Sequence, residues 1–290
     1  MSKLHFLPVV NTDELARMNQ SVLEIRHEIA ESLGRSALEA IDRGEYLTDT
    51  GTVDWAASIQ KAKASKVSIP PDASLPPVES NRYSKTHVTV ANQTTFAAAR
   101  DLLEQGYRPL ALNFANGVET GGGFLRGATA QEEALCRCSA LYATLLGDPM
   151  YDFHRETDPA ASSAWAILSP DVPVFRDDAG MEYDQPWLLS FLTCAAPYAP
   201  SIGRARSAKM LRQRIDRVLA IAQAYRYNSL VLGAWGCGAF GNDPLQTAKD
   251  FRDALEGDFA GVFSSVIFAI ADWSQQRRYL RPFSDVFSEA

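Results

Sequence analysis

Hydrophobic and polar positions in the N-terminal region repeat with the period of an amphipathic helix. Between residues 12 and 47, apolar residues recur at spacings of three and four: Leu15, Met18, Val22, Ile25, Ile29 and Leu33. This spacing predicts a helix with one apolar face. Thr12 is suited to cap its start, whereas Gly34 interrupts the pattern. Residues 64–85 carry four prolines among serines and alanines, which predicts an irregular linker or surface strap.

From about residue 87 the chain alternates between short apolar runs and amphipathic stretches. The predicted strands are residues 87–91, 109–114, 164–168, 187–194, 229–234 and 262–271, with a Pro- and Asp-rich stretch between the third and fourth. The predicted helices are residues 94–104, 130–146 and 206–225 and a segment that ends near residue 255. Continuous apolar strands that alternate with helices indicate an α/β fold whose central sheet is covered on both faces. We expect residues 1–85 to pack on this core and to cover one edge of the sheet.

The most informative segment is GGGFLRGATAQEE, which runs from Gly121 to Glu133. Consecutive glycines let the backbone approach a ligand closely or adopt a positive φ. Two adjacent carboxylates, Glu132 and Glu133, open the helix that follows. Thr129 and Glu132 have the spacing of a capping box, which would explain Glu132 without any catalytic role. Glu133 has no such local explanation and is therefore the better catalytic candidate.

A general acid that works near neutral pH needs a raised pKa. The helix N-terminus favours the ionised form of Glu133, whereas burial, the Glu132 carboxylate and a bound phosphate favour the protonated form. We expect the second group of effects to prevail when a doubly negative ligand fills the site. Glu133 would then protonate a leaving oxygen and afterwards deprotonate water. Asn116, just after a strand, suits hydrogen bonds to sugar hydroxyls, and equally a simple turn.

A second glycine loop matches the pattern GxGxxG between a predicted strand and a predicted helix: Gly236, Cys237, Gly238, Ala239, Phe240 and Gly241. Asn242 or Asp243 would cap that helix, with Pro244 at its first position. Successive backbone N–H groups in such a loop form a nest for a diphosphate. Phe240 would stack on a sugar or base, or else anchor the loop in the core. A Rossmann dinucleotide site is the rival interpretation, but too little chain follows the loop for further βαβ units.

Composition and charge exclude several classes of function. The net charge of −7 and the pI near 5.2 argue against general binding to nucleic acid. The four cysteines have no CxxC spacing, and the four histidines lie near no cysteine or carboxylate cluster, so we predict no metal and no cofactor. The N-terminal apolar run is too short for a signal peptide, and no stretch is long enough for a membrane span. We therefore expect a cytoplasmic protein without a membrane partner.

Taken together, these residues resemble the poly(ADP-ribose) glycohydrolases of bacterial type, which are built on a macrodomain. The signature of that family is three glycines, six to eight residues, and then Gln-Glu-Glu. Here seven residues separate the glycines from Gln131, Glu132 and Glu133. Residues 169–180 (SPDVPVFRDDAG) and 233–244 (GAWGCGAFGNDP) are also similar to family segments. The resemblance implies a macrodomain-like mixed sheet flanked by helices, with residues 86–290 as the ADP-ribose-binding domain.

The resemblance also implies residue roles. Glu133 would protonate the ribose–ribose glycosidic oxygen and activate water, while Glu132 would hold hydroxyls of the adjacent ribose. The second loop would bind the diphosphate, Phe240 would pack on the distal ribose, and Asn92–Thr95 would contact adenine. The implied ligand-binding residues are Thr94, Asn116, Gly121, Gly122, Gly123, Gln131, Gly236, Cys237, Gly238, Ala239, Phe240 and Gly241.

The activity implied by the resemblance is hydrolysis of poly(ADP-ribose), mainly from chain ends, with release of ADP-ribose. The partners would be poly(ADP-ribose) or ADP-ribosylated proteins. Two alternatives stay open: hydrolysis of protein- or nucleobase-linked ADP-ribose, and a binding module that cleaves nothing. A binding module would not need both glutamates. One departure from the family pattern is Thr120, where relatives often carry proline, with the added negative charge of Glu119 beside it.

Overall fold

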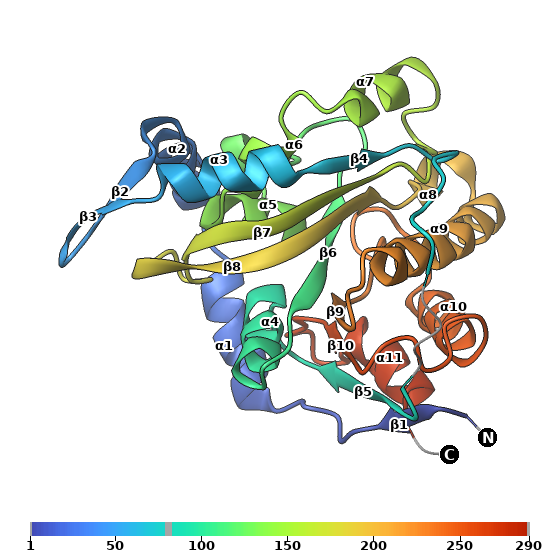
Figure 1. Ribbon diagram of the computed structural model, residues 1–290. Helices are drawn as coiled ribbons and strands as arrows, with labels where there is room; N and C mark the ends of the chain where they lie inside the picture. Colours follow the sequence, from blue (N-terminus) through green and yellow to red (C-terminus); the bar gives the residue numbers. More distant parts are fainter. Residues whose placement is uncertain (1, 79–82, 289–290) are drawn as a thin grey trace.

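An eight-stranded sheet forms the centre of the molecule, with helices on both of its faces (Figure 1). The computed structural model describes residues 2–78 and 83–288. Across the sheet the strand order is β1-β5-β10-β9-β6-β8-β7-β4. These strands are β1 Leu4–Phe6, β4 Val67–Ile69, β5 Thr86–Ala91, β6 Pro109–Ala115, β7 Ala166–Arg176, β8 Glu182–Ala195, β9 Ser229–Leu232 and β10 Ser265–Ala269, and a separate hairpin pairs β2 Glu45–Thr48 with β3 Gly51–Asp54.

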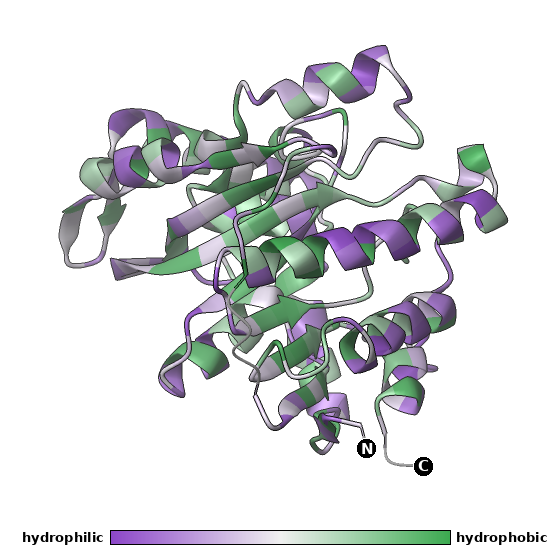
Figure 2. Ribbon diagram, turned by 45° about the vertical axis from the view of Figure 1, so that its right-hand side comes forward, coloured by the Kyte–Doolittle hydropathy of each residue, from purple (hydrophilic) through white to green (hydrophobic). Residues whose placement is uncertain are grey.

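The pairing in this sheet is mixed. Neighbouring strands from β1 to β8 run parallel, whereas β7 pairs antiparallel with both β8 and β4. Alternate residues of each strand enter different cores: Leu110 and Leu112 pack on one face, and Ala111 on the other. The central strands are accordingly largely hydrophobic, while the helices alternate between hydrophilic and hydrophobic residues (Figure 2). The predicted α/β fold with a central mixed sheet is confirmed.

Two groups of helices cover the two faces. Residues of α9, α10 and α11 pack on one face, and residues of α2 to α7 on the other. The helices are α1 Asp13–Leu23, α2 His27–Arg43, α3 Ala56–Ser65, α4 Thr95–Glu104, α5 Gln131–Cys138, α6 Leu141–Leu145, α7 Pro149–Glu156, α8 Ala199–Ile202, α9 Arg204–Ala224, α10 Pro244–Glu256 and α11 Leu280–Val286, with the 3₁₀ helix η1 at Phe124–Arg126.

The N-terminal region contains more than the predicted helix. Thr12 caps α1 as expected, since its Oγ1 accepts from the Leu15 N–H at 3.1 Å. The single helix predicted over residues 12–47 is wrong: the chain leaves the helical conformation between α1 and α2, and after α2 Gly44 adopts φ +73° before the β2–β3 hairpin. The predicted apolar positions are not the buried face: α1 buries Ala16 and α2 buries Ala30 and Ala37, whereas Met18 and Ile29 are exposed. The two helices lie over different parts of the core (Figure 1).

Residues 1–85 also complete the sheet. β1 adds to β5 at one edge, and β4 adds to β7 at the other. The predicted linker over residues 64–85 therefore holds a strand, and residues 79–82 of it lie outside the described residues. We expected this region to cover one edge of the sheet, but it supplies the edge strand on both sides, β1 and β4. The domain boundary at residue 85 stays a prediction.

The helix predicted over residues 130–146 is interrupted at Ser139. Its hydroxyl donates to the Leu135 carbonyl and accepts from the Leu141 N–H, so the chain turns between α5 and α6. Ser139 also forms a bridge to Val174, and Ala140 donates to the Pro173 carbonyl at 3.0 Å. Pairing with β7 thus overrides the helical pattern of the sequence.

The Pro- and Asp-rich stretch is not a connection between strands. Residues 169–176 belong to β7, which pairs with β8 over a much longer hairpin than predicted. The register shifts between Ser169 and Val172, and Asp171 has φ +49°. Such an irregularity is where a strand accepts proline, so Pro170 and Pro173 do not end it.

Gly34 lies where α2 crosses the residues that follow β6. A Cβ at this position would lie 2.4 Å from the Phe124 carbonyl oxygen and 3.3 Å from the Phe124 ring. The sequence pattern predicted that Gly34 interrupts the helix, but Gly34 lies within α2. It lets the helix and the loop pack backbone against backbone.

We expect Gly34→Ala to destabilise the fold by about 1–3 kcal/mol, because the methyl group overpacks this contact. In an open helix the same change would stabilise by up to about 1 kcal/mol. Urea unfolding monitored by circular dichroism measures the difference. Ser32→Ala, at an exposed position of α2, is the control and should change little. A gain in stability for Gly34→Ala would contradict the close packing.

Candidate active site

The glycine loop, residues 116–130, joins β6 to α5 and brings its backbone against two carboxylates. Gly121 and Gly122 have φ of +68° and +59°, a region that L side chains rarely adopt. A Cβ at Gly122 would lie 2.3 Å from Oε1 of Glu133 and 3.1 Å from Oε2 of Glu132. Glycine is required at this position both by conformation and by space.

Glu132 and Glu133, at the start of α5, are 3% and 8% exposed. The Gly123 N–H donates to Oε1 of Glu133 at 2.9 Å. Glu132 accepts from the Asn116 N–H at 2.7 Å and from the Asn113 amide at 3.2 Å. Burial raises the pKa of Glu132 well above its ordinary value, and the Glu133 charge raises it further. Glu132 is therefore suited to keep a proton at neutral pH.

The predicted capping box is wrong. Ala130 is the N-cap of α5 and makes no side-chain cap, so Thr129 does not fill that role. Glu132 turns to the end of β6 instead of to its own helix. The local explanation for Glu132 therefore fails.

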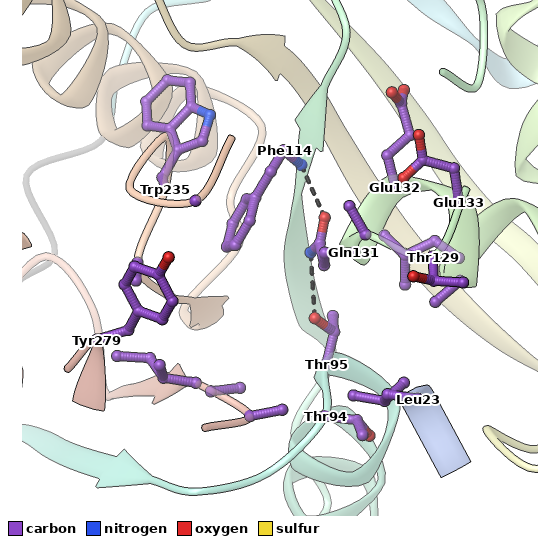
Figure 3. Close-up of a pocket in the computed structure, with 18 of the residues that line it drawn as sticks. Leu23, Thr94, Thr95, Phe114, Thr129, Gln131, Glu132, Glu133, Trp235 and Tyr279 are labelled. Atoms are coloured by element: carbon purple, nitrogen blue, oxygen red, sulfur yellow. Dashed lines mark hydrogen bonds between the residues drawn. The ribbon is translucent and has the colours of Figure 1, made fainter. Parts of the chain in front are cut away.

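Gln131 fastens α5 to β6. Its Oε1 accepts from the Phe114 N–H at 2.9 Å, and its Nε2 donates to Oγ1 of Thr95 at 3.1 Å (Figure 3). Nε2 also donates to the Leu112 carbonyl at 2.8 Å. Both amide hydrogens are thereby used within the protein. The predicted contact of Gln131 with a ribose stays a prediction, and only its carbonyl oxygen has capacity left for it.

Asn116 both forms the turn and faces the site. Its Oδ1 accepts from the N–H groups of Val118 and Glu119 at 2.9 and 3.0 Å, which is an Asx turn. Within the described part of the chain, its Nδ2 has no hydrogen-bond partner. The amide nitrogen is therefore available to a ligand, and the two roles considered for this residue do not exclude one another.

The second glycine loop is held in shape by Asn242. Its Nδ2 donates to the Pro197 and Gly236 carbonyls, and its Oδ1 accepts from the Ser207 hydroxyl at 2.5 Å. Asp243, one of the two predicted caps, is the N-cap of α10, and it accepts from the Gln246 N–H at 2.8 Å. The loop conformation is thereby fixed before any ligand arrives.

This loop offers several unpaired backbone donors. The N–H groups of Gly236, Gly238, Ala239 and Phe240 have no partner among residues 2–78 and 83–288. All four residues line the same cavity. Unpaired N–H groups at the entry to a helix form an anion site without any cationic side chain. The Cys237 N–H, in contrast, donates to the Ala234 carbonyl at 3.1 Å. Its buried thiol points toward Thr247, and burial raises the thiol pKa to about 12.

Both loops open into one cavity of about 500 Å³. Of the residues predicted from the sequence, the following line it: Thr94, Asn116, Gln131, Glu132, Glu133, Gly236, Gly238, Ala239 and Phe240. The predicted residues that do not line it are Gly121, Gly122, Gly123, Cys237 and Gly241. Gly121, Gly122 and Gly241 have positive φ and shape the turns of the two loops. The ligand contacts of all these residues stay predictions.

The cavity has an acidic lining. Its ionisable side chains include Glu132, Glu133 and Asp178, and none of its described lining residues is Lys, Arg or His. On the outer side of the glycine loop, Arg126 forms an ion pair with Glu119, which lowers the pKa of that carboxyl. The extra charge of Glu119 is thus neutralised inside the loop. A negative ligand in the cavity would depend on backbone N–H groups.

Comparisons with known proteins place this site in a family. Residues 34–177 match the family model "Microbial-type PARG, catalytic domain". The poly(ADP-ribose) glycohydrolase of Thermomonospora curvata is similar at 37% identity and a TM-score of 0.82, over 90% of this chain and 100% of that one. The chain belongs to the microbial-type poly(ADP-ribose) glycohydrolase family.

Two further structures of this family contain a bound molecule. The T. curvata enzyme bound to the inhibitor ADP-HPD is similar at 37% identity and a TM-score of 0.81, over 90% of this chain and 99% of that one. The enzyme of Deinococcus radiodurans in complex with ADP-ribose has 37% identity and a TM-score of 0.71, over 79% and 96%. A comparison with curated proteins finds no match. The resemblance inferred from the sequence motifs is confirmed.

The segment that the family resemblance assigned to adenine divides into two parts. Asn92 is fully buried and bonds to Asn11, Asn19 and the backbone of Asp272, so it belongs to the core. Gln93, Thr94 and Thr95 line the cavity. Thr94 also caps α4, and its hydroxyl donates to Asp178 at 2.5 Å.

Sequence reasoning missed several lining residues. Asp178 lies in the segment already identified as family-like, and its adjacent acidic pair with Asp177 was the available signal. Burial raises the pKa of Asp178 to about 6. Leu23 from the end of α1, together with Trp273 and Tyr279 after β10, closes other sides of the cavity. No local pattern identifies these three.

The described residues contain neither a candidate metal-ligand group nor a helix suited to span a membrane. Residues 2–78 and 83–288 contain no group of three or more His, Cys, Asp or Glu side chains arranged to hold a metal ion. Every helix in the same ranges is too short or too polar to span a bilayer. The expectations of no cofactor and of a cytoplasmic location stay predictions.

Gly238→Val should abolish binding of ADP-ribose while leaving the fold intact. A Cβ at Gly238 meets nothing within 4 Å, so a larger side chain would enter the open cavity beside the unpaired N–H groups. Isothermal titration calorimetry measures binding, and thermal unfolding measures stability. Gly236→Val is the comparison: its φ is +75° and its Cβ would lie 2.7 Å from Ala196, so it should lose both. Normal affinity in Gly238→Val would contradict the role of this loop.

Asp178 should make the protein less stable as pH rises from about 4 to about 6. Its pKa is about 6 when folded and 3.8 in its ordinary state, so the unfolded chain gives up the proton first over this range. Asp178→Asn removes that titration and can still accept from Thr94. We expect the variant to gain up to about 3 kcal/mol over wild type between pH 4 and pH 7.

Urea midpoints at both pH values measure this difference. Asp49→Asn, at an exposed position, is the control and should follow wild type at each pH. An Asp178→Asn advantage that is equal at pH 4 and pH 7 would show that the carboxyl does not titrate in this range.

Proposed function

We propose that this chain hydrolyses the ribose–ribose O-glycosidic bond of poly(ADP-ribose), mainly at chain ends, and releases ADP-ribose. One observation carries the proposal: the buried Glu132–Glu133 pair and the unpaired N–H groups of the second glycine loop open into the same cavity. A diphosphate in the second loop would thus hold a ribose within reach of the carboxylates. The T. curvata and D. radiodurans enzymes, which bind ADP-HPD and ADP-ribose, support this choice of ligand.

Glu133 acts as the general acid and base in this proposal. Gly123 holds Oε1 of Glu133, whereas Oε2 has no hydrogen-bond partner among the described residues. Oε2 is therefore free to give a proton to the glycosidic oxygen as the bond to the anomeric carbon breaks. The leaving chain end departs as an alcohol, and the sugar passes through an oxocarbenium-like state. The Glu133 carboxylate then takes a proton from the water that attacks this carbon.

Glu132 has a different role because of its environment. Burial raises its pKa and favours the protonated form, in which it would present an O–H donor to a ribose hydroxyl. The two carboxylates are sequence neighbours on one helical turn. They do not flank a sugar from opposite faces, as the acid and base of typical glycosidases do. The pair therefore works as one proton donor and one hydroxyl clamp.

The size of the cavity supports action at chain ends. A volume of about 500 Å³ suits one nucleotide-sized ligand, and α1 and the residues after β10 close two of its sides. A terminal ADP-ribose unit fits such a space, whereas an internal unit would need an exit at both ends. This shape supports release of single ADP-ribose units.

Glu133→Gln should keep the affinity for ADP-ribose and lower turnover of poly(ADP-ribose) by on the order of 10² or more, because an amide cannot donate an acidic proton. The amide oxygen still accepts from Gly123, so the loop keeps its shape. Glu104→Gln, an exposed glutamate on α4, is the matched control and should turn over like wild type. Undiminished turnover in Glu133→Gln would refute its role.

The substrate is tested in the same assay by offering polymer, serine-linked and nucleobase-linked ADP-ribose side by side and measuring free ADP-ribose. Fastest release from the polymer supports the proposal. Release of ADP-ribose only from a serine or nucleobase linkage would show that the substrate is that linkage and not the polymer. Binding without release from any of the three would indicate a non-catalytic module.

A further inference from the structure

Two neighbouring residues at the C-terminal end of α7 bond to successive carbonyl groups at the start of the glycine loop. The His154 ring lies 2.8 Å, through Nδ1, from the Gly117 carbonyl oxygen. Arg155 donates through Nη1 to the Val118 carbonyl. His154 is completely buried, whereas Arg155 is exposed. The stronger of these two anchors is therefore the histidine.

The tautomer of His154 follows from its second nitrogen. The Ser163 N–H donates to Nε2 at 3.0 Å, so Nε2 must be an acceptor and the ring proton lies on Nδ1. Nδ1 is then the donor to Gly117. Burial lowers the pKa of His154, which favours this neutral form. His154 is not among the lining residues of the active-site cavity, so its ring does not reach the reacting atoms.

A continuous path of hydrogen bonds leads from this ring to Glu132. The peptide unit between Gly117 and Val118 is held at both ends, because its carbonyl accepts from His154 and its N–H donates to Oδ1 of Asn116 at 2.9 Å. The Asn116 N–H in turn donates to Oε2 of Glu132 at 2.7 Å. A rotation of that one peptide unit would displace the donor that orients Glu132.

The surroundings leave this peptide unit little freedom on the other side. A Cβ at Gly117 would lie 2.2 Å from the hydroxyl of Ser162, so the loop packs directly against the segment that also supplies Ser163. The start of the glycine loop is thus in contact with α7 through His154 and with residues 162–163 through Ser162. Displacements of about 1 Å at a reacting group can cost on the order of 10² in rate.

We propose that His154 is a positioning residue of the reaction, which orients Glu132 and the start of the glycine loop through the Gly117–Val118 peptide. This inference rests on the proposed function, because its test measures cleavage of the proposed substrate, whereas the hydrogen bonds of His154 do not depend on that function. It predicts that loss of the Nδ1 donor lowers the rate of cleavage more than the affinity for ADP-ribose.

Two amide substitutions separate the donor to Gly117 from the rest of the ring. His154→Asn places an amide nitrogen near the position of Nδ1, whereas His154→Gln places it near Nε2. We expect kcat on the cleavable substrate to be at least tenfold higher in His154→Asn than in His154→Gln, with the Kd for ADP-ribose within about threefold of wild type in both. His154→Ala should match His154→Gln. Glu156→Gln, at an exposed position at the end of α7, is the control and should retain wild-type kcat.

Equal kcat in the Asn and Gln variants would overturn the inference, and so would a parallel loss of kcat and ADP-ribose binding, which indicates only a structural role. If His154→Ala does not fold, the amide pair decides alone, and variants too unstable to bind ADP-ribose count as the structural outcome. Failure of the proposed function would be visible in the wild-type protein and in Glu133→Gln. Failure of this inference would be visible only in the His154 variants.

Discussion

Two neighbouring carboxylates are held almost out of water beside a cavity whose described lining supplies no cation, and most of the surrounding structure serves this arrangement. Burial of two such charges would be costly if both were ionised. The cost is limited in two ways. Burial raises the pKa of Glu132, which favours its neutral form, and each carboxylate accepts a backbone N–H, from Asn116 or from Gly123. Backbone donors can come this close only where Gly122 leaves out a side chain.

The carboxylates depend on a loop that is supported from several directions. Gln131 fixes the start of α5 to β6, Gly34 allows α2 to pack against η1, and His154 holds the beginning of the loop. The second glycine loop is fixed independently by Asn242. Donors that are already oriented lose little free energy to reorganisation during a reaction, which is the main advantage of a rigid polar site. The same rigidity would let this cavity bind an anion without arginine or lysine.

Much of the fold follows from local pattern, because buried strands and amphipathic helices have distinct periods. The exceptions are places where a distant partner decides. Ser139 ends α5 because the chain there pairs with β7. The Glu132 side chain does not cap its own helix, because it accepts hydrogen bonds from residues at the end of β6. For the site, the motifs identified Glu133 and the two glycine loops. Asp178 and Tyr279 reach the cavity only through the three-dimensional fold, and no spacing in the sequence records that.

The N-terminal region has a consequence beyond the reaction. β1 and β4 are the outermost strands of the sheet, and each has only three residues. They cover the longer strands β5 and β7, whose free N–H and C=O groups would otherwise offer a template to another chain. Short terminal strands present too few such groups for stable pairing. Through β1 and β4, the N-terminal region thus also shields the sheet against edge-to-edge aggregation.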